Sequence, residues 1–97
     1  MHEWDLFSNH GLTLICIARQ PGSRVRDIAD CVGITERAAS RIVGDLCERG
    51  LITRTREGRR NRYEIVADKP LGHMLTDGVR VGDLLAPFTG AGPLPSR

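Results

Sequence analysis

The middle of the chain carries two short amphipathic helical patterns joined by a glycine-containing turn. The first pattern places apolar residues at helical spacing, at Val25, Ile28, Ala29 and Val32. Gly33 suits the left-handed conformation that ends a helix, and Ile34 can then pack back into the core. Thr35 can cap the next helix, whose apolar stripe comprises Ala39, Ile42, Val43, Leu46 and Cys47 and which Gly50 closes. Two helices joined in this way form one supersecondary unit.

Another helix is predicted ahead of this pair, beginning near His10 behind a cap at Ser8 or Asn9. The breaker residues 20–23 end it. Its apolar residues fall on two faces, one with Leu12, Ile15 and Cys16 and the other with Leu14, Ile17 and Ala18. A helix that is apolar on two faces must be covered on both sides, and a second subunit could supply the second cover.

Behind Gly50 the apolar pattern changes. Residues 51–56 and 62–66 are β-prone and residues 57–61 favour a turn, so a hairpin is predicted. A weaker helix follows from about Thr76, with an apolar stripe at Val81, Leu84, Leu85 and Phe88. The predicted class is α+β, mostly α. A three-helix core and the hairpin occupy residues 1–70, a C-terminal helix lies within 71–88, and residues 89–97 form a disordered tail.

Positive charge is concentrated in one segment of this chain, whose 97 residues allow a single domain. The net charge is only +2, yet residues 36–62 hold eight arginines against four acidic residues. Within residues 54–62 there are five arginines and one glutamate. Thirteen of the fourteen basic residues are arginine, whose guanidinium group can bind phosphates and bases through two hydrogen bonds. This distribution favours a polyanionic partner.

The composition also argues against several classes of protein. No apolar run approaches about 18 residues, so no membrane-spanning helix is expected. The N-terminus lacks the pattern of a secretory signal, and three cysteines without a CxxC pair favour a reducing cytoplasm. The sequence shows no nucleophile–base set, no paired carboxylates and no phosphate-binding loop. We therefore expect neither an enzyme nor a bound cofactor.

The order of two helices, a glycine-containing turn and an arginine-tipped hairpin is that of a winged helix-turn-helix. Residues 25–65, VRDIADCVGITERAASRIVGDLCERGLITRTREGRRNRYEI, resemble the DNA-binding core of MarR-like and ArsR-like bacterial transcriptional regulators. The likeness lies in a DIAxxVGIT helix and turn, an SRIVxxLxxRGLI helix and an RxGRRNRY wing. It implies a transcriptional regulator, most simply a repressor, in the cytoplasm of a bacterium or archaeon and associated with the nucleoid.

The predicted partner is double-stranded DNA, with the helix over residues 36–49 in the major groove and the wing over 54–62 on the backbone or minor groove. The groove admits one helix, so the base-facing side must be polar and the rear must be anchored to a core. The candidate DNA-contacting residues are Thr35, Glu36, Arg37, Ala38, Ser40 and Arg41 on the helix, and Arg54, Arg56, Arg59, Arg60 and Arg62 on the wing. Arg59 and Arg60 are expected to extend beyond the body of the domain.

A homodimer on a palindromic operator is also predicted, because one recognition helix reads few base pairs. Its candidate interface comprises Leu12, Ile15, Val81, Leu84, Leu85 and Phe88. The last four are expected to be loosened from the core by the break around Pro70. Longer MarR-like proteins carry additional terminal helices that form a ligand pocket. Here we expect no large pocket, while a small one at the dimer interface stays open, and the effector is not identified.

Two other functions remain open at this point. The first is a winged-helix module that binds a protein. The second is a thiol- or metal-responsive regulator that is switched through Cys16, Cys31 or Cys47. ArsR-like metal sensors carry closely paired cysteines, whereas Cys31 stands alone in DIADCVG. We therefore expect no metal site.

Overall fold

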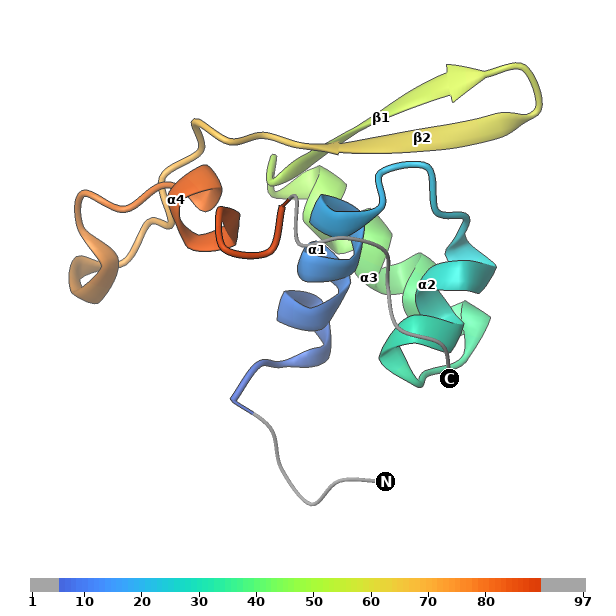
Figure 1. Ribbon diagram of the computed structural model, residues 1–97, viewed down its shortest axis with the longest axis horizontal. Coiled ribbons are helices and arrows are strands. Elements are labelled where there is room, and N and C mark those ends of the chain that lie inside the picture. The colour runs from blue at the N-terminus through green and yellow to red at the C-terminus, as the bar shows by residue number, and fades with distance from the viewer. Residues whose placement is uncertain (1–5, 90–97) are drawn as a thin grey trace.

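The computed structural model describes residues 6–89, in which three helices pack together and a long hairpin lies along one side of them (Figure 1). The elements are α1 (Asn9–Arg19), α2 (Val25–Val32), α3 (Glu36–Glu48), β1 (Ile52–Glu57) and β2 (Arg60–Ile65). A short 3-10 helix η1 (Met74–Thr76) and the one-turn helix α4 (Val81–Leu85) follow. These last two elements lie at the end of the molecule opposite the hairpin turn (Figure 1). Four α-helices and a two-stranded hairpin within residues 6–89 confirm the predicted α+β, mostly helical class.

Side-chain caps and glycines set the helix boundaries where the sequence predicts them. The hydroxyl of Ser8 accepts a hydrogen bond from the backbone N–H of Gly11 (3.1 Å), so Ser8 rather than Asn9 caps α1. Thr35 caps α3 by accepting from the N–H of Ala38 at 3.1 Å. Gly33 ends α2 with φ 85°, a conformation that glycine adopts without steric cost.

The hairpin differs from its predicted bounds, because its turn is shorter. Ile52 pairs with Ile65 and Glu57 with Arg60, so only Gly58 and Arg59 remain in the turn. Gly58 has φ 63°, which permits this tight connection. The consequence is that Arg60 belongs to β2 and not to the turn.

One buried cluster unites all the major elements. It contains residues from the three N-terminal helices, both strands and α4: Leu14, Cys16, Ile17, Ile28, Ala29, Ala39, Ile42, Val43, Leu46, Ile52, Tyr63, Val81 and Leu85. Both predicted stripes of the central helix pair enter this cluster. The recognition-helix candidate α3 is therefore anchored along its rear face, as the sequence predicts.

The C-terminal segment corrects two expectations. The predicted helix from Thr76 does not form, because Thr76 ends η1, Gly78 adopts φ 82° and α4 begins only at Val81. Val81 is 0% exposed and Leu85 is 2% exposed, so the prediction that these two are apolar surface left free for a second subunit is wrong. They fill the chain's own core because the chain returns to the helices after residue 80.

Backbone pairing ties this segment down at its base. The N–H groups of Val81 and Gly82 donate to the carbonyls of Lys69 (2.8 Å) and Ala67 (2.9 Å). Any side chain at Gly82 would place its Cβ 2.8 Å from Cβ of Ala67, which is too close for a real contact. Gly82 therefore permits the close approach that seats α4. The predicted tail begins at Thr89, whose N–H donates to the carbonyl of Leu85 (3.1 Å), and residues 90–97 lie outside the described part of the chain.

Candidate nucleic-acid interface

The first half of α3 presents a polar face to solvent while its rear is held in the core. Thr35, Glu36, Arg37, Ser40 and Arg41 are exposed and Ala38 is half-buried. Ala39, Ile42, Val43 and Leu46 are buried on the other side of the same helix. Thr35, Arg37, Ala38 and Arg41 line one shallow hollow of about 330 Å³. A helix held in this way can enter a groove without losing its anchor.

The arginines of α3 have no ionic partner within residues 6–89. Asp45, one turn beyond Arg41, is the natural helical partner for it. Its carboxylate oxygen instead lies 2.9 Å from Nε2 of His10 on α1. Neither Arg37 nor Arg41 forms an ion pair or hydrogen bond through its side chain in the described part of the chain. Their guanidinium groups therefore keep their hydrogen-bonding capacity for a ligand.

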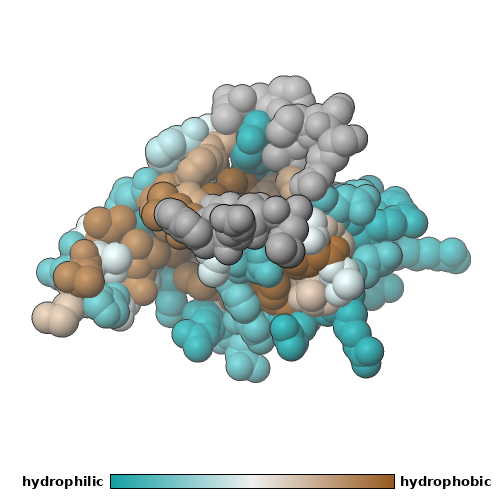
Figure 2. Space-filling view, turned by 90° about the horizontal axis from the view of Figure 1, so that it is seen from below, coloured by the Kyte–Doolittle hydropathy of each residue, from teal (hydrophilic) through white to brown (hydrophobic). Residues whose placement is uncertain are grey.

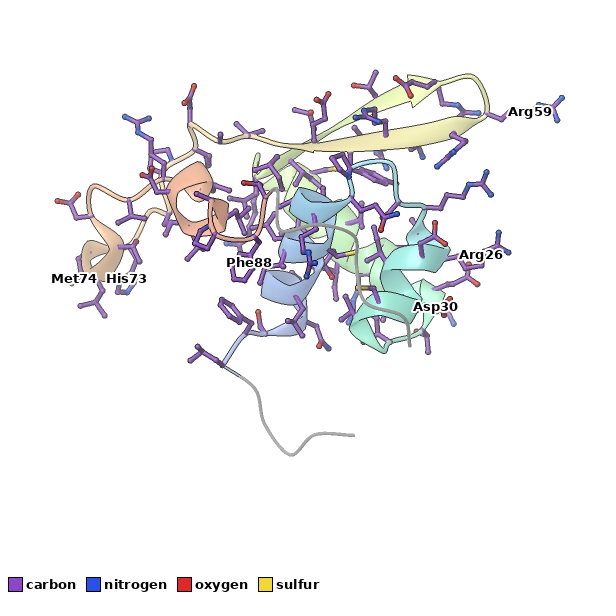
Figure 3. The ribbon with its side chains drawn as sticks, in the orientation of Figure 1. Arg26, Asp30, Arg59, His73, Met74 and Phe88 are labelled. Carbon is purple, nitrogen blue, oxygen red and sulfur yellow. The ribbon has the colours of Figure 1, made fainter. Side chains whose placement is uncertain are left out.

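The wing carries arginines on both of its faces. The register places Arg54 and Arg56 on the face that begins with buried Ile52, and both arginines are exposed. Nε of Arg56 donates to the carbonyl of Gly58 at 3.0 Å, which stabilises the turn. Arg59 extends from the tip of the wing into solvent (Figure 3). Arg62 is half-buried.

Arg60 does not lie beyond the body of the domain, contrary to the sequence expectation. Its guanidinium donates a hydrogen bond to the carbonyl of Gly22, in the loop between α1 and α2. The reason is the short turn, since Arg60 lies within β2 and its long side chain reaches back over that loop. Arg60 thus ties the wing to the helices.

Two arginines at the beginning of α2 are not among the residues predicted from the sequence to contact DNA. Arg24 precedes the first residue of α2 and Arg26 lies within its first turn, and both side chains are exposed. Arg26 extends toward the same end of the molecule as Arg59 (Figure 3). The sequence does contain a signal for them, because arginines stand on both sides of Val25, the first residue of the apolar stripe. The basic segment predicted from the sequence begins at residue 36 and therefore does not include them.

Apolar surface gathers at the opposite end of the molecule, over η1 and α4 (Figure 2). Met74 is 84% and Leu75 is 87% exposed, and neither was singled out from the sequence. Leu84 is 39% exposed, whereas Leu12, Ile15 and Phe88 are half-buried. The ring of Phe88 packs edge-on against Phe7 with centroids 6.3 Å apart.

The cysteines give no sign of a metal centre. None of the three forms a disulfide bond, and within residues 6–89 no three His, Cys, Asp or Glu side chains lie close enough to hold a metal ion. Burial raises the pKa of the Cys16 thiol to about 12, and the neighbouring Cys31 adds to the rise. Cys16 is thus a protonated core residue at neutral pH. None of the helices in the described region is long and apolar enough to cross a membrane.

Comparison with solved structures supports the architecture. A predicted DNA-binding transcriptional regulator from E. coli aligns with a TM-score of 0.57 at 20% identity, over 82% of this chain and 74% of that one. MepR, a transcription regulator of the multidrug efflux pump MepA of Staphylococcus aureus, aligns with a TM-score of 0.58 at 22% identity. That alignment covers 87% of this chain but only 56% of MepR. At these identities the likeness establishes the fold.

Sequence comparison supplies the family. No curated protein sequence matches the chain. The model of the MarR family, however, matches residues 5–62, which is more than half of the chain and includes α1, the central helix pair and the wing to Arg62. The chain therefore belongs to the MarR family, whose winged-helix fold serves DNA-binding transcriptional regulation and not catalysis.

Proposed function

We propose that the chain is a sequence-specific regulator of transcription that binds double-stranded DNA as a homodimer and represses by blocking polymerase. The observation that carries this proposal is the first half of α3, which combines a polar exposed face, a buried rear and two arginines without an ionic partner in the described residues. Two structurally similar proteins are transcription regulators, and this supports the same role here.

Base reading is assigned to α3 in the major groove. Arg37 can donate two hydrogen bonds to O6 and N7 of guanine, and Glu36 can accept from N4 of cytosine. Ala38 can contact a thymine methyl group. Thr35, Ser40 and Arg41 complete the polar face and are suited to phosphate oxygens or neighbouring bases. Arg54, Arg56, Arg59 and Arg62 of the wing are assigned to the backbone or the minor groove, where positive charge supplies affinity.

The dimer interface is assigned to the apolar surface that remains after the core is filled. Among the predicted interface residues Leu84 is the exposed one, and the half-buried Leu12, Ile15 and Phe88 can extend its surface. A two-fold pairing of this kind would separate the two recognition helices by about 34 Å and favour a palindrome whose half-sites are about 10 base pairs apart. Sedimentation as a monomer at tens of micromolar, a concentration at which even weak association shows, would overturn the dimer.

Selection of bound duplexes from a random DNA pool tests the function directly. We expect a palindromic site whose affinity exceeds that of a scrambled duplex by about a thousandfold or more, with a steep dependence on salt. Arg49→Ala serves as the matched control, because Arg49 is exposed but lies at the other end of α3. Recovery of no common sequence, together with binding that does not respond to salt, would refute the proposal.

A further inference from the structure

A groove separates the wing from the beginning of α2 and is large enough for a ligand group. Its volume is about 400 Å³, and Arg24, Val25, Arg59, Arg60, Asn61 and Tyr63 line it. Arg24 and Val25 belong to the helical wall, whereas the other four belong to the hairpin. Residues distant in the sequence therefore face one common space. Within this group Tyr63 is buried in the core, so the inner end of the groove is rigid.

Three of the six lining residues are arginines, and they do not have the same role. Arg60 already donates to the carbonyl of Gly22, in the loop that leads into Arg24, and so holds the two walls together. Arg24 and Arg59 are exposed, and their guanidinium groups form no ion pair within residues 6–89. The nearby carboxylate of Asp27 accepts from the backbone N–H of Arg24 at 3.1 Å and caps α2.

Positive charge on both walls suits an anion that must be held from two sides. A guanidinium group binds a phosphate oxygen pair through two parallel hydrogen bonds. The groove includes Arg59, which extends into solvent at the same end of the molecule as Arg26 (Figure 3). A phosphodiester of the DNA backbone fits these requirements.

We propose that this groove binds one phosphate of the DNA backbone in each half-site, with Arg24 and Arg59 contacting it from opposite walls. Arg60 is a positioning residue that sets the distance between those walls through Gly22. The inference rests on the proposed function and adds to it a specific backbone position, which the base-reading residues of α3 do not provide.

Neutral backbone scanning tests the shared contact. Each phosphate of the selected duplex is replaced in turn by a methylphosphonate, symmetrically in both half-sites, and affinity is measured by fluorescence anisotropy. The proteins are the wild type, Arg24→Gln, Arg59→Gln and the control Arg49→Gln, all of which change exposed side chains. For the wild type we expect a loss of roughly tenfold at the phosphate that the groove binds. Arg24→Gln and Arg59→Gln should both show a smaller loss at that same position, because each keeps only one of the two guanidinium contacts, and Arg49→Gln should retain the full loss.

The outcomes separate the groove from the general function. If both variants become less sensitive at one common phosphate, the shared site is supported. If they become insensitive at two different phosphates, or at none, the shared site is wrong although wild-type DNA binding stands. A wild-type protein that binds no duplex overturns both proposals. The salt dependence of the double variant Arg24→Gln/Arg59→Gln gives a second measure, because loss of one shared phosphate contact lowers the slope by about 0.9 per half-site, whereas loss of two separate contacts lowers it by about 1.8.

Discussion

The helix pair α2–α3 and the C-terminal segment 66–89 both carry apolar stripes, but the molecule uses them differently. In the helix pair the stripe residues are buried, like Ile28 and Ile42, or half-buried, like Val25, and the arginines are exposed. In the C-terminal segment Val81 and Leu85 turn inward, while Leu84 and the neighbouring pair Met74 and Leu75 are exposed. The apolar stripe of each helix in the pair packs toward the core, whereas the apolar residues of the C-terminal segment are divided between core and surface.

The contrast shows that helical periodicity predicts which side chains are buried but does not identify the surface that covers them. The pattern at Val81, Leu84, Leu85 and Phe88 predicts contact with a second subunit, because Pro70 and the nearby glycines favour a detached segment. Hydrogen bonds from Val81 and Gly82 back to Lys69 and Ala67 instead return the chain to its own core. Nothing in the local pattern signals these long-range pairings.

The largest expected effect tests the inward half of the C-terminal segment. Leu85→Ala should lower the free energy of unfolding by roughly 2–5 kcal/mol, because it removes a buried side chain and leaves a cavity. Chemical denaturation of the full chain measures this loss. A cost below about 1 kcal/mol would mean that α4 does not contribute to the core, and the two regions would then differ more than the structure indicates.

The outward face of the helix pair should affect DNA binding and leave stability unchanged. Arg37→Ala is expected to cost on the order of 1–3 kcal/mol on the selected site and to flatten preference at one base pair per half-site. Competition between single-base variants of the site measures both quantities. Retention of full sequence preference would transfer base reading to Glu36, Ser40 and Arg41.

The boundary of α3 offers a smaller effect in the same region. Thr35→Val keeps the shape of the side chain but removes the oxygen that accepts from the N–H of Ala38, and should cost about 1 kcal/mol of unfolding free energy. Thr35→Ser, which retains the hydroxyl, is the control and should remain close to the wild type. Equal stability of the Val and Ser variants would show that the cap contributes nothing.

The smallest expected change in stability lies on the outward half of the C-terminal segment. Leu84→Ala should alter the unfolding free energy of the monomer by no more than about 0.5 kcal/mol, since the side chain is 39% exposed. The same variant should weaken self-association in sedimentation experiments if Leu84 lies in the dimer interface. Unchanged association would remove Leu84 from that interface and leave the half-buried Leu12 and Ile15 as its candidates.

Local features of the structure could be predicted from the sequence, whereas contacts between distant residues could not. Caps at Ser8 and Thr35 and the left-handed Gly33 are local, so the helix boundaries followed from neighbouring residues. The polar face of α3 followed from its period. The hydrogen bond from Arg60 to Gly22 spans 38 residues, and the pairing of His10 with Asp45 spans 35. Such contacts depend on how the elements pack, which a pattern read along the chain does not contain.

The pairing of Pro70 with Arg80 has a consequence for how the scaffold could change over time. The chain leaves the body of the domain and returns to it at this bridge. Residues 71–79 therefore form a loop that is closed at its base, and the length of this loop does not affect how α4 packs against Ala67. Doubling such a loop costs only about 0.6 kcal/mol in closure entropy. Insertions and deletions at its tip, beside Met74 and Leu75, should therefore be tolerated. This is the place where a lineage could remodel the outer surface while the DNA-binding core stays the same.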